Sequence, residues 1–264
     1  MRYQRLFQEE ALKITDIPNF CLWVDTKLVE GNHINYTLYN PDVILKDKEG
    51  MTILKKAIKK NSKSEFEEVF KMYFFESISG MIQIGHEAKI VPDLAYKIDF
   101  SAAKPGSKAG VLLYDIAMSY VSKKGKGLIP DRFSVSSFAQ KVWNYYFTKR
   151  TDVKHIPIDD MKSPVTKDKK DDGKLYTKKN IPKEFVDKGY DHRSFINQIY
   201  IMKKPLNYSN LMKNHNSFLL NLYTELKKGI DEKNLQVNIM ESIRLSMGMA
   251  QGEFFNSIYD YDNN

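Results

Sequence analysis

The fold is decided by residues 95–130, which read AYKIDFSAAKPGSKAGVLLYDIAMSYVSKKGKGLIP. A β-prone run at 95–100 alternates between apolar and polar residues, which is typical of a strand. Small residues make up the loop at 104–110, and apolar residues at helical spacing follow over 112–121. A short apolar run at 127–130 closes the segment. The pattern predicts a strand, a glycine-containing loop, an amphipathic helix and a second strand in close succession.

The loop has the composition of an anion-binding site. A helix start exposes backbone N–H groups that have no partner within the helix, and it carries the positive end of the helix dipole. Glycine and other small residues let the phosphates of a ligand approach those N–H groups. The candidate cofactor-binding residues are Gly106, Ser107, Lys108, Ala109 and Gly110. The loop follows neither the Walker A spacing nor the dinucleotide-binding fingerprint.

A second helix and a further strand are predicted downstream. The helix opens in the serine cluster at 134–137, where Ser137 and Gln140 have the spacing of a capping box. Its expected buried face consists of Phe138, Ala139, Val142, Trp143 and Tyr146. Residues 153–158 form the next expected strand.

Upstream of the segment, strand and helix patterns follow one another. Residues 18–40 are expected to form a β-hairpin or a pair of strands, and 43–45 a further short strand. Residues 52–79 have helical periodicity, with a helix start signal at 62–65. A strand is expected at 81–84, directly before the strand that opens the deciding segment.

The rest of the chain divides into a basic insert and a helical extension. Residues 161–190 carry nine lysines against five acidic residues and show little periodicity, which is typical of a solvated loop. Residues 195–202 are strand-like, and 207–257 are helical with a break at Gly229. We expect four regions: strands and a helix at 1–80 that complete the core, the core itself at 81–160, the insert at 161–190, and a final strand with the helical extension at 191–264.

Length and composition indicate a globular protein. The resemblance to a known family that residues 95–159 carry implies the α/β (α+β) class, with a mixed central sheet flanked by helices. Of the 264 residues 42% are hydrophobic and 28% charged, which is enough to bury one large core. The single cysteine, Cys21, is expected to be a small buried side chain. No signal peptide or membrane-spanning segment is visible, so a cytoplasmic origin and no membrane partner are expected. The net charge of +8 permits unspecific contact with nucleic acid at most.

Over Ala95–Asp159 the sequence resembles the cofactor-binding half of the GNAT superfamily of N-acyltransferases. In that fold a strand leads into a loop that binds the pyrophosphate of coenzyme A. A helix, a strand, a second helix and a final strand follow. Several short runs are also similar to GNAT-like proteins encoded by tailed bacteriophages: 101–103, 110–118, 127–132, 135–136 and 142–146.

The resemblance implies a GNAT-like acyl-CoA-dependent N-acyltransferase of a tailed phage, with acetyl-CoA as cofactor. It would act in the host cytoplasm on a protein or a small-molecule amine. The alternative is a catalytically inactive GNAT-like structural component of the virion, in contact with other virion proteins. Two departures from the family favour this alternative. The loop lacks the leading Arg or Gln, and Trp143 occupies the slot of the general-acid tyrosine.

Acyl transfer to an amine requires a base that removes a proton from the ammonium group. The strands at 81–100 offer His86 and Asp99 for this role, and Asp99 is expected on the face opposite Tyr96, Ile98 and Phe100. The structural alternatives are a solvated histidine and an exposed strand carboxylate.

The departing thiolate requires an acid, for which Tyr145 and Tyr146 are the candidates beside the tyrosine slot. The structural alternative is that one or both of these tyrosines belong to the core. No metal site is expected, because the histidines are scattered and no second cysteine accompanies Cys21.

Overall fold

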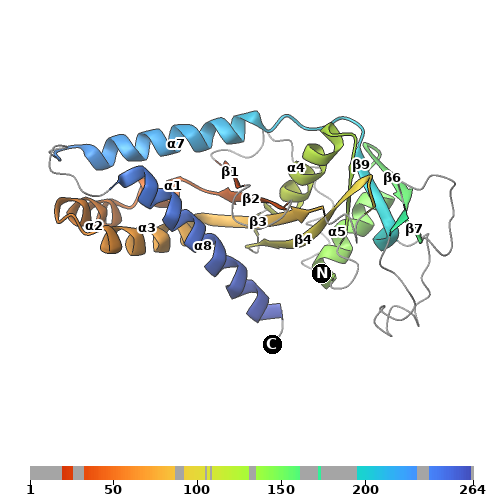
Figure 1. Ribbon diagram of the computed structural model, residues 1–264, viewed down its shortest axis with the longest axis horizontal. Coiled ribbons are helices and arrows are strands. Elements are labelled where there is room, and N and C mark those ends of the chain that lie inside the picture. Colours follow the sequence, from red (N-terminus) through yellow and green to blue (C-terminus); the bar gives the residue numbers. More distant parts are fainter. Residues whose placement is uncertain are drawn as a thin grey trace.

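The computed structural model shows a seven-stranded open sheet with helices on both faces, which confirms the predicted α+β class (Figure 1). The structure describes residues 20–25, 33–86, 92–104, 106–107, 109–130, 135–160, 172–173, 195–230 and 238–262. The strands lie in the order β1-β2-β3-β4-β5-β9-β6. Their bounds are Cys21–Asp25 (β1), His33–Tyr39 (β2), Ile78–Gly85 (β3), Ala95–Ala103 (β4), Gly127–Ile129 (β5), Val153–Pro157 (β6) and Gln198–Met202 (β9).

The sheet is mixed. The first four strands pair antiparallel in sequence order, as predicted for the strands at 18–40. β4 and β5 pair parallel, because the helix between them returns the chain to the same edge. β9 then lies between β5 and β6 and pairs antiparallel with both. The last strand of the sequence is therefore an interior strand of the sheet.

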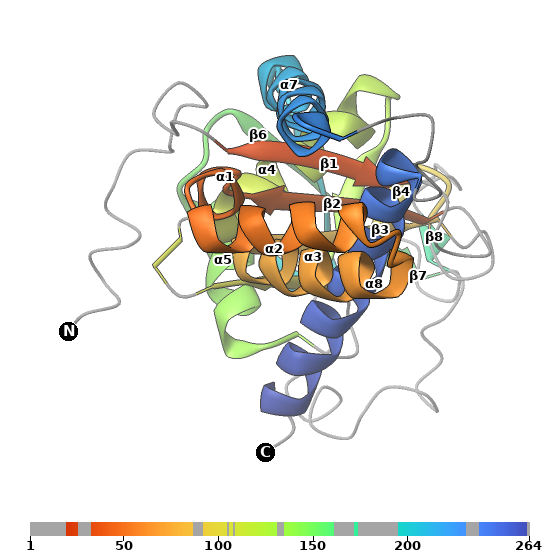
Figure 2. The same ribbon diagram turned by 90° about the vertical axis from the view of Figure 1, so that its left-hand side faces the viewer.

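Two apolar clusters lie on opposite faces of the sheet, and neighbouring residues such as Leu38 and Tyr39 belong to different clusters. The helices are α1 (Asp42–Leu45), α2 (Lys48–Lys59), α3 (Lys63–Ser77), α4 (Ala109–Lys123), α5 (Ser137–Thr148), α7 (Ser209–Lys227) and α8 (Ile239–Asp262). α4 and α5 cover one face, and α2, α3 and α8 cover the other. α7 lies along the edge strand β1, which Figure 2 shows from the end of the molecule.

The strand predicted at 43–45 is wrong, because these residues form part of the single helical turn α1. Proline at position 41 has a φ of −66°, which suits a helix start. The N–H of Asp42 donates to Oδ1 of Asn40 at 3.0 Å, so a local side-chain contact stabilises the turn.

The helix predicted over 52–79 is in fact two helices, α2 and α3. The chain separates them at Asn61, whose φ of +53° interrupts the helix. The start signal at 62–65 is confirmed, since Oγ of Ser62 accepts from the N–H of Glu65 at 3.4 Å.

The second predicted helix of the core is α5, with two corrections. Its capping residue is Ser136 and not Ser137, because Oγ of Ser136 accepts from the N–H of Ala139 at 3.2 Å. Trp143 and Tyr146 are buried as predicted, but Phe138 is 48% exposed.

The C-terminal extension is helical as predicted, and Gly229 separates α7 from α8 with a φ of +77°. The apolar stripes of both helices are buried with the phenylalanines of α3, which include Phe66, Phe70 and Phe74. Most of the basic insert at 161–190 lies outside the described residues. Within it, β8 (Asp172–Gly173) pairs with β7 (Asp159–Asp160).

A buried polar contact joins α7 to the sheet. The hydroxyl of Tyr39 lies 2.7 Å from Nδ1 of His215, and burial lowers the pKa of His215 to about 4, with the charge of Arg244 acting in the same direction. A neutral imidazole can accept the tyrosine proton at Nδ1, whereas a protonated one cannot. Cys21 is buried on the same face, and burial raises its pKa to about 11, so it is the small buried side chain that the sequence predicted.

We expect the fold to lose stability between pH 6.5 and pH 4 because of His215. The unfolded chain binds a proton at this histidine near pH 6.5, whereas the folded chain binds one only near pH 4. The contribution of His215 to the free energy of unfolding is therefore fully present above pH 6.5. It falls as the pH falls, by roughly 3 kcal/mol at pH 4. Urea unfolding of the wild type and His215→Gln across this range measures the effect. Equal losses in the two proteins would contradict it.

Candidate functional site

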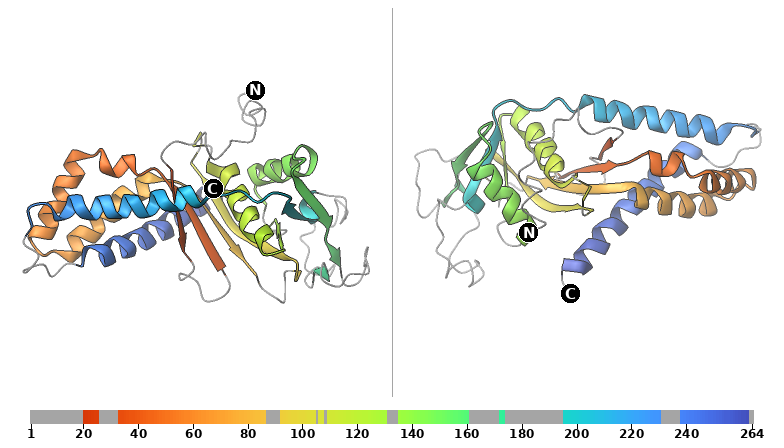
Figure 3. Two further views of the ribbon diagram at one scale, coloured as in Figure 1. Left: turned by 90° about the horizontal axis from the view of Figure 1, so that it is seen from above. Right: turned by 180° about the vertical axis from the view of Figure 1, so that it is seen from behind.

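The two parallel strands β4 and β5 pair over a short length only. Their register joins Ala95 to Gly127, Tyr96 to Leu128 and Lys97 to Ile129. The register of this pair ends at Lys97 and Ile129, the last residue of β5, whereas β4 stays paired with β3 as far as Ala103. α4 packs against this part of the sheet (Figure 3). The parallel pairing therefore ends before the predicted anion-binding loop.

The loop is fixed to the start of β3. The N–H of Lys104 donates to the carbonyl oxygen of Ser79 at 2.9 Å, and Oγ of Ser107 donates to the same oxygen at 3.1 Å. Nζ of Lys104 donates to the carbonyl oxygen of Glu76 at 2.5 Å. Of the predicted loop residues, Lys108 lies outside the described part of the chain. The other four are in place at the start of α4.

The amides of the loop are partly occupied. The N–H of Ser107 donates to the carbonyl oxygen of Lys104 at 3.1 Å, and the N–H of Ala109 donates to Oγ of Ser107 at 3.3 Å. Ser107 therefore makes a local side-chain-to-backbone contact just before the first residue of α4. A phosphate that bound at Ala109 would have to replace this serine hydroxyl.

The two glycines of the loop differ in their surroundings. Gly106 has a φ of +75°, and a Cβ placed on it would have no atom within 4 Å. A Cβ on Gly110 would lie 3.5 Å from Cβ of Ala103 and 3.5 Å from the ring of Phe138. An alanine fits at Gly110 at ordinary van der Waals distance, whereas a longer side chain must displace the half-exposed ring of Phe138. The open space at Gly106 is compatible with a bound phosphate group.

The strand β4 contains a bulge at Asp99. Gln83 of β3 pairs with Phe100 and Ile84 pairs with Ile98, so Asp99 is the extra residue. The bulge reverses the alternation of the strand. Ile98 belongs to the cluster on the α4 face and Phe100 to the cluster on the α8 face, so the prediction that they share a face is wrong.

Asp99 lies between two basic side chains. Its Oδ2 is 2.8 Å from Nδ1 of His33 at the start of β2, and its Oδ1 is 3.2 Å from Nζ of Lys97. The side chains of His33 and Asp99 are 15% and 17% exposed, so the pair is shielded but reachable. The sequence named Asp99 but missed His33. The two residues are 66 positions apart in the sequence, so their contact depends on the register of three strands, which local patterns do not reveal.

His86, the other predicted base, lies apart from this pair. Its Nδ1 is 2.8 Å from the carbonyl oxygen of Ala95, and its ring lies 5.4 Å from that of Tyr96. Tyr96 packs against the cluster on the α4 face. The structure therefore brings Asp99 together with His33 and leaves His86 bound to the backbone of β4.

The predicted acids occupy the core side of α5. Tyr146 is fully buried, its hydroxyl donates to Oδ1 of Asp115 at 2.7 Å, and burial raises its pKa well above the ordinary value. Tyr145 is half-buried, with its ring 6.0 Å from that of Tyr146. Trp143, in the slot of the family's acid, is 1% exposed. Tyr146 thus has a structural role in the fold.

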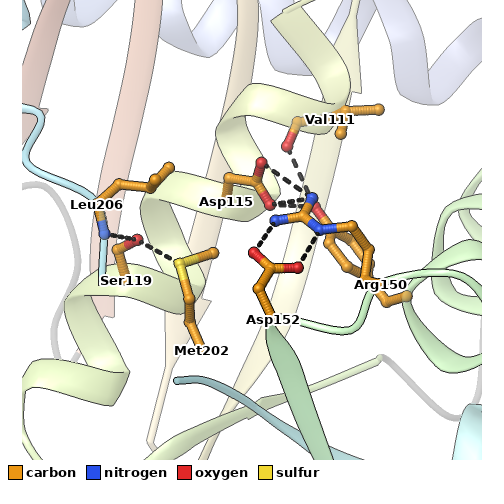
Figure 4. A network of polar contacts seen from close by, with 8 residues as sticks. Val111, Asp115, Ser119, Arg150, Asp152, Met202 and Leu206 are labelled. Atoms are coloured by element: carbon orange, nitrogen blue, oxygen red, sulfur yellow. Dashed lines mark hydrogen bonds and ion pairs between the residues drawn. The ribbon is translucent and has the colours of Figure 1, made fainter. Parts of the chain in front are cut away.

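Tyr146 belongs to a charged network that joins α4 to the start of β6 (Figure 4). Nη1 of Arg150 lies 3.1 and 3.2 Å from the two oxygens of Asp115, and Nε and Nη2 donate to Asp152 at 2.7 and 2.8 Å. Burial raises the pKa of Asp115, and the charge of Arg150 opposes this rise. The Tyr146 hydroxyl also lies 3.3 Å from the carbonyl oxygen of Val111. The network fixes the first turns of α4, which carry the loop.

Comparison with family models, with curated proteins and with solved structures finds no match for this chain. Within the described ranges, no three His, Cys, Asp or Glu side chains come together as a metal site would require. No helix in the described part of the chain is long and apolar enough to cross a bilayer.

Proposed function

We propose that the chain is an acyl-CoA-dependent N-acyltransferase with a GNAT-like core. The observation that supports this best is the succession of β4, the glycine-containing loop and α4, with the start of β4 paired parallel to β5. The bulge at Asp99, with His33 in contact, lies between the last residue that pairs with β5, Lys97, and the loop. The element order from β4 to β6 also agrees with the order that the resemblance implies.

The two halves of the proposed site lie along one strand. From Asp99 to Lys104 an extended chain rises by roughly 16 Å, which separates the proton-accepting groups from the loop. The open position at Gly106 and the N-terminal turn of α4 would hold the pyrophosphate of acetyl-CoA. Acetyl-CoA would supply the acyl group as a thioester. His33 and Asp99 offer the proton acceptor that an ammonium group requires before it can attack.

Calorimetric titration of the full chain with acetyl-CoA tests this function. We expect saturable heat and a rise in the melting temperature with acetyl-CoA, since a ligand that binds only the folded state stabilises it. At 100 times the Kd the gain is about 2.7 kcal/mol. Free coenzyme A should also bind, because it has the same pyrophosphate, whereas pantetheine without phosphates should bind far more weakly. Neither heat nor stabilisation with acetyl-CoA would refute the function.

A scaffold without catalysis, such as a structural component of a phage virion, is the second candidate. Two observations favour it: the buried hydroxyl of Tyr146 is held by Asp115, and Ser107 already occupies the N–H of Ala109. This reading predicts no acyl transfer to any amine and the presence of the chain in purified particles. Mass spectrometry of such particles would exclude it if the chain were absent.

A further inference from the structure

The contact between His33 and Asp99 crosses a third strand. The register places His33 of β2 beside Gly85 of β3, and Gly85 beside Lys97 of β4. Paired residues of antiparallel strands point to the same face, so the imidazole and the carboxylate meet over Gly85 on the α8 face. Asp99 reaches this face because the bulge adds one residue to β4.

Glycine is required at position 85 for this contact to exist. A Cβ placed there would lie 2.5 Å from Oδ2 of Asp99 and 2.5 Å from Nδ1 of His33, the two atoms of the hydrogen bond. Both a strand glycine and a bulge weaken a sheet locally. A partly exposed ion pair contributes little to stability in return. Gly85 and the bulge at Asp99 therefore allow the contact between His33 and Asp99, although both weaken the sheet locally.

The hydrogen bonds assign different roles to the two residues. An ionised carboxylate can only accept, so the proton of the contact belongs to Nδ1 of His33. Nε2 of His33 then carries the lone pair of the ring. The contact with Asp99 does not use this nitrogen, so it can accept a proton from another group. Asp99 has one oxygen on His33 and the other on Lys97. The imidazole is therefore better placed than the carboxylate to take a proton from a substrate.

We propose that His33 is the general base of acyl transfer and that Asp99 is a positioning residue that holds its tautomer across Gly85. This assignment rests on the proposed function. Nε2 takes one proton from the substrate ammonium, which leaves a neutral amine. The amine forms the N–C bond to the acyl carbon as the C–S bond breaks. The second proton of the nitrogen passes to the sulfur, so an amide and a thiol form, and His33 returns its proton to water.

Among the described residues, the charged groups that the printed contacts place at this pair are Asp99 itself and Lys97 of β4. Asn35 lies two residues after His33 in β2, on the same face of the sheet, and it pairs with Asp25 of β1. The substrate amine would approach from this face, opposite the helix α4.

Steady-state kinetics with acetyl-CoA and a panel of primary amines tests the assignment. We expect His33→Asn to lower kcat by about 100- to 10,000-fold, to lose the acidic limb of the pH–rate profile, and to keep the calorimetric Kd for acetyl-CoA. Asp99→Asn should lower kcat less than His33→Asn does, because the imidazole remains but its tautomer is no longer held by the carboxylate. Gly85→Ala should behave as Asp99→Asn does, provided that its melting temperature shows a folded protein. His155→Asn, at an exposed position of β6, is the matched control and should change none of these values.

Two outcomes would overturn the assignment and leave the proposed function intact. One is turnover by His33→Asn that keeps the rate and the acidic limb of the wild type. The other is a fall in melting temperature in both the His33 and Asp99 variants with unchanged pH profiles, which would show a purely structural pair. The nitrogen-15 spectrum of the histidine ring gives a readout that needs no turnover. It should place the proton on Nδ1 in the wild type, and a proton on Nε2 would refute the assignment. Failure to bind acetyl-CoA would refute the proposed function itself.

Discussion

Replacing Arg150 with methionine is expected to destabilise the fold by about 3–5 kcal/mol at pH 7. The side chains of Arg150 and Asp115 are 7% and 5% exposed, so the variant leaves a buried carboxylate without its cation. Burial already raises the pKa of Asp115, and the loss of the guanidinium raises it further. Urea unfolding monitored by circular dichroism measures the change as a shift of the midpoint.

The cost in Arg150→Met should depend on pH. A carboxyl group whose folded pKa is raised contributes stability below that pKa and loses it as the pH rises. The destabilisation should therefore be smaller at pH 5 than at pH 8. The double variant Arg150→Met with Asp115→Asn should recover much of the loss, since it removes the charge that lost its partner. A cost below about 1 kcal/mol at every pH would contradict the importance of this contact.

Replacing Gly110 with glutamate is expected to weaken acetyl-CoA binding by at least about 100-fold, which corresponds to about 2.7 kcal/mol. A carboxylate in the first turn of α4 would occupy the place of the pyrophosphate and repel it. The same charge favours the helix itself, because the N-terminus of a helix attracts anions. In the folded state this gain opposes the cost of displacing the half-exposed ring of Phe138, so thermal unfolding should show a small change in stability while calorimetry shows the loss of binding.

Two controls separate charge from size at Gly110. In Gly110→Ala the added Cβ meets its neighbours at 3.5 Å, so binding should change little. Gly110→Gln has the length of glutamate without its charge and must also displace the ring of Phe138. Binding by Gly110→Gln that is intermediate between the alanine and glutamate variants would show both contributions. Unchanged binding by Gly110→Glu would place the anion elsewhere on the chain.

The elements predicted correctly are those whose hydrophobic pattern lies within one continuous segment of the sequence. The strand, loop and helix at 95–123 are where the alternation, the small residues and the helical spacing placed them. The errors at 43–45 and at the start of α5 have a similar origin. At the start of α5, the residue that caps the helix is one position before the residue with the capping-box spacing. At 43–45, a run of three apolar residues fits a helical turn as well as a strand.

The candidate site was less accessible to sequence reasoning. Asp99 was predicted from its strand, but its partner His33 depends on the register of β2, β3 and β4, which long-range pairing determines. The bulge that turns Phe100 to the other face leaves no local signal either. Tyr146 was predicted as an acid and as a core residue, and only the contact with Asp115 shows which environment it occupies.

The position of α7 has a consequence for biosynthesis. The ribosome completes β1 long before it completes α7, so the helix that lies along this edge strand in the described part of the chain is missing until the last quarter of the chain has emerged. Partly made chains with such an edge are prone to intermolecular pairing. Expression of fragments that end before Ser209 should therefore yield insoluble material, and a chaperone that shields strand edges would be useful only during this interval.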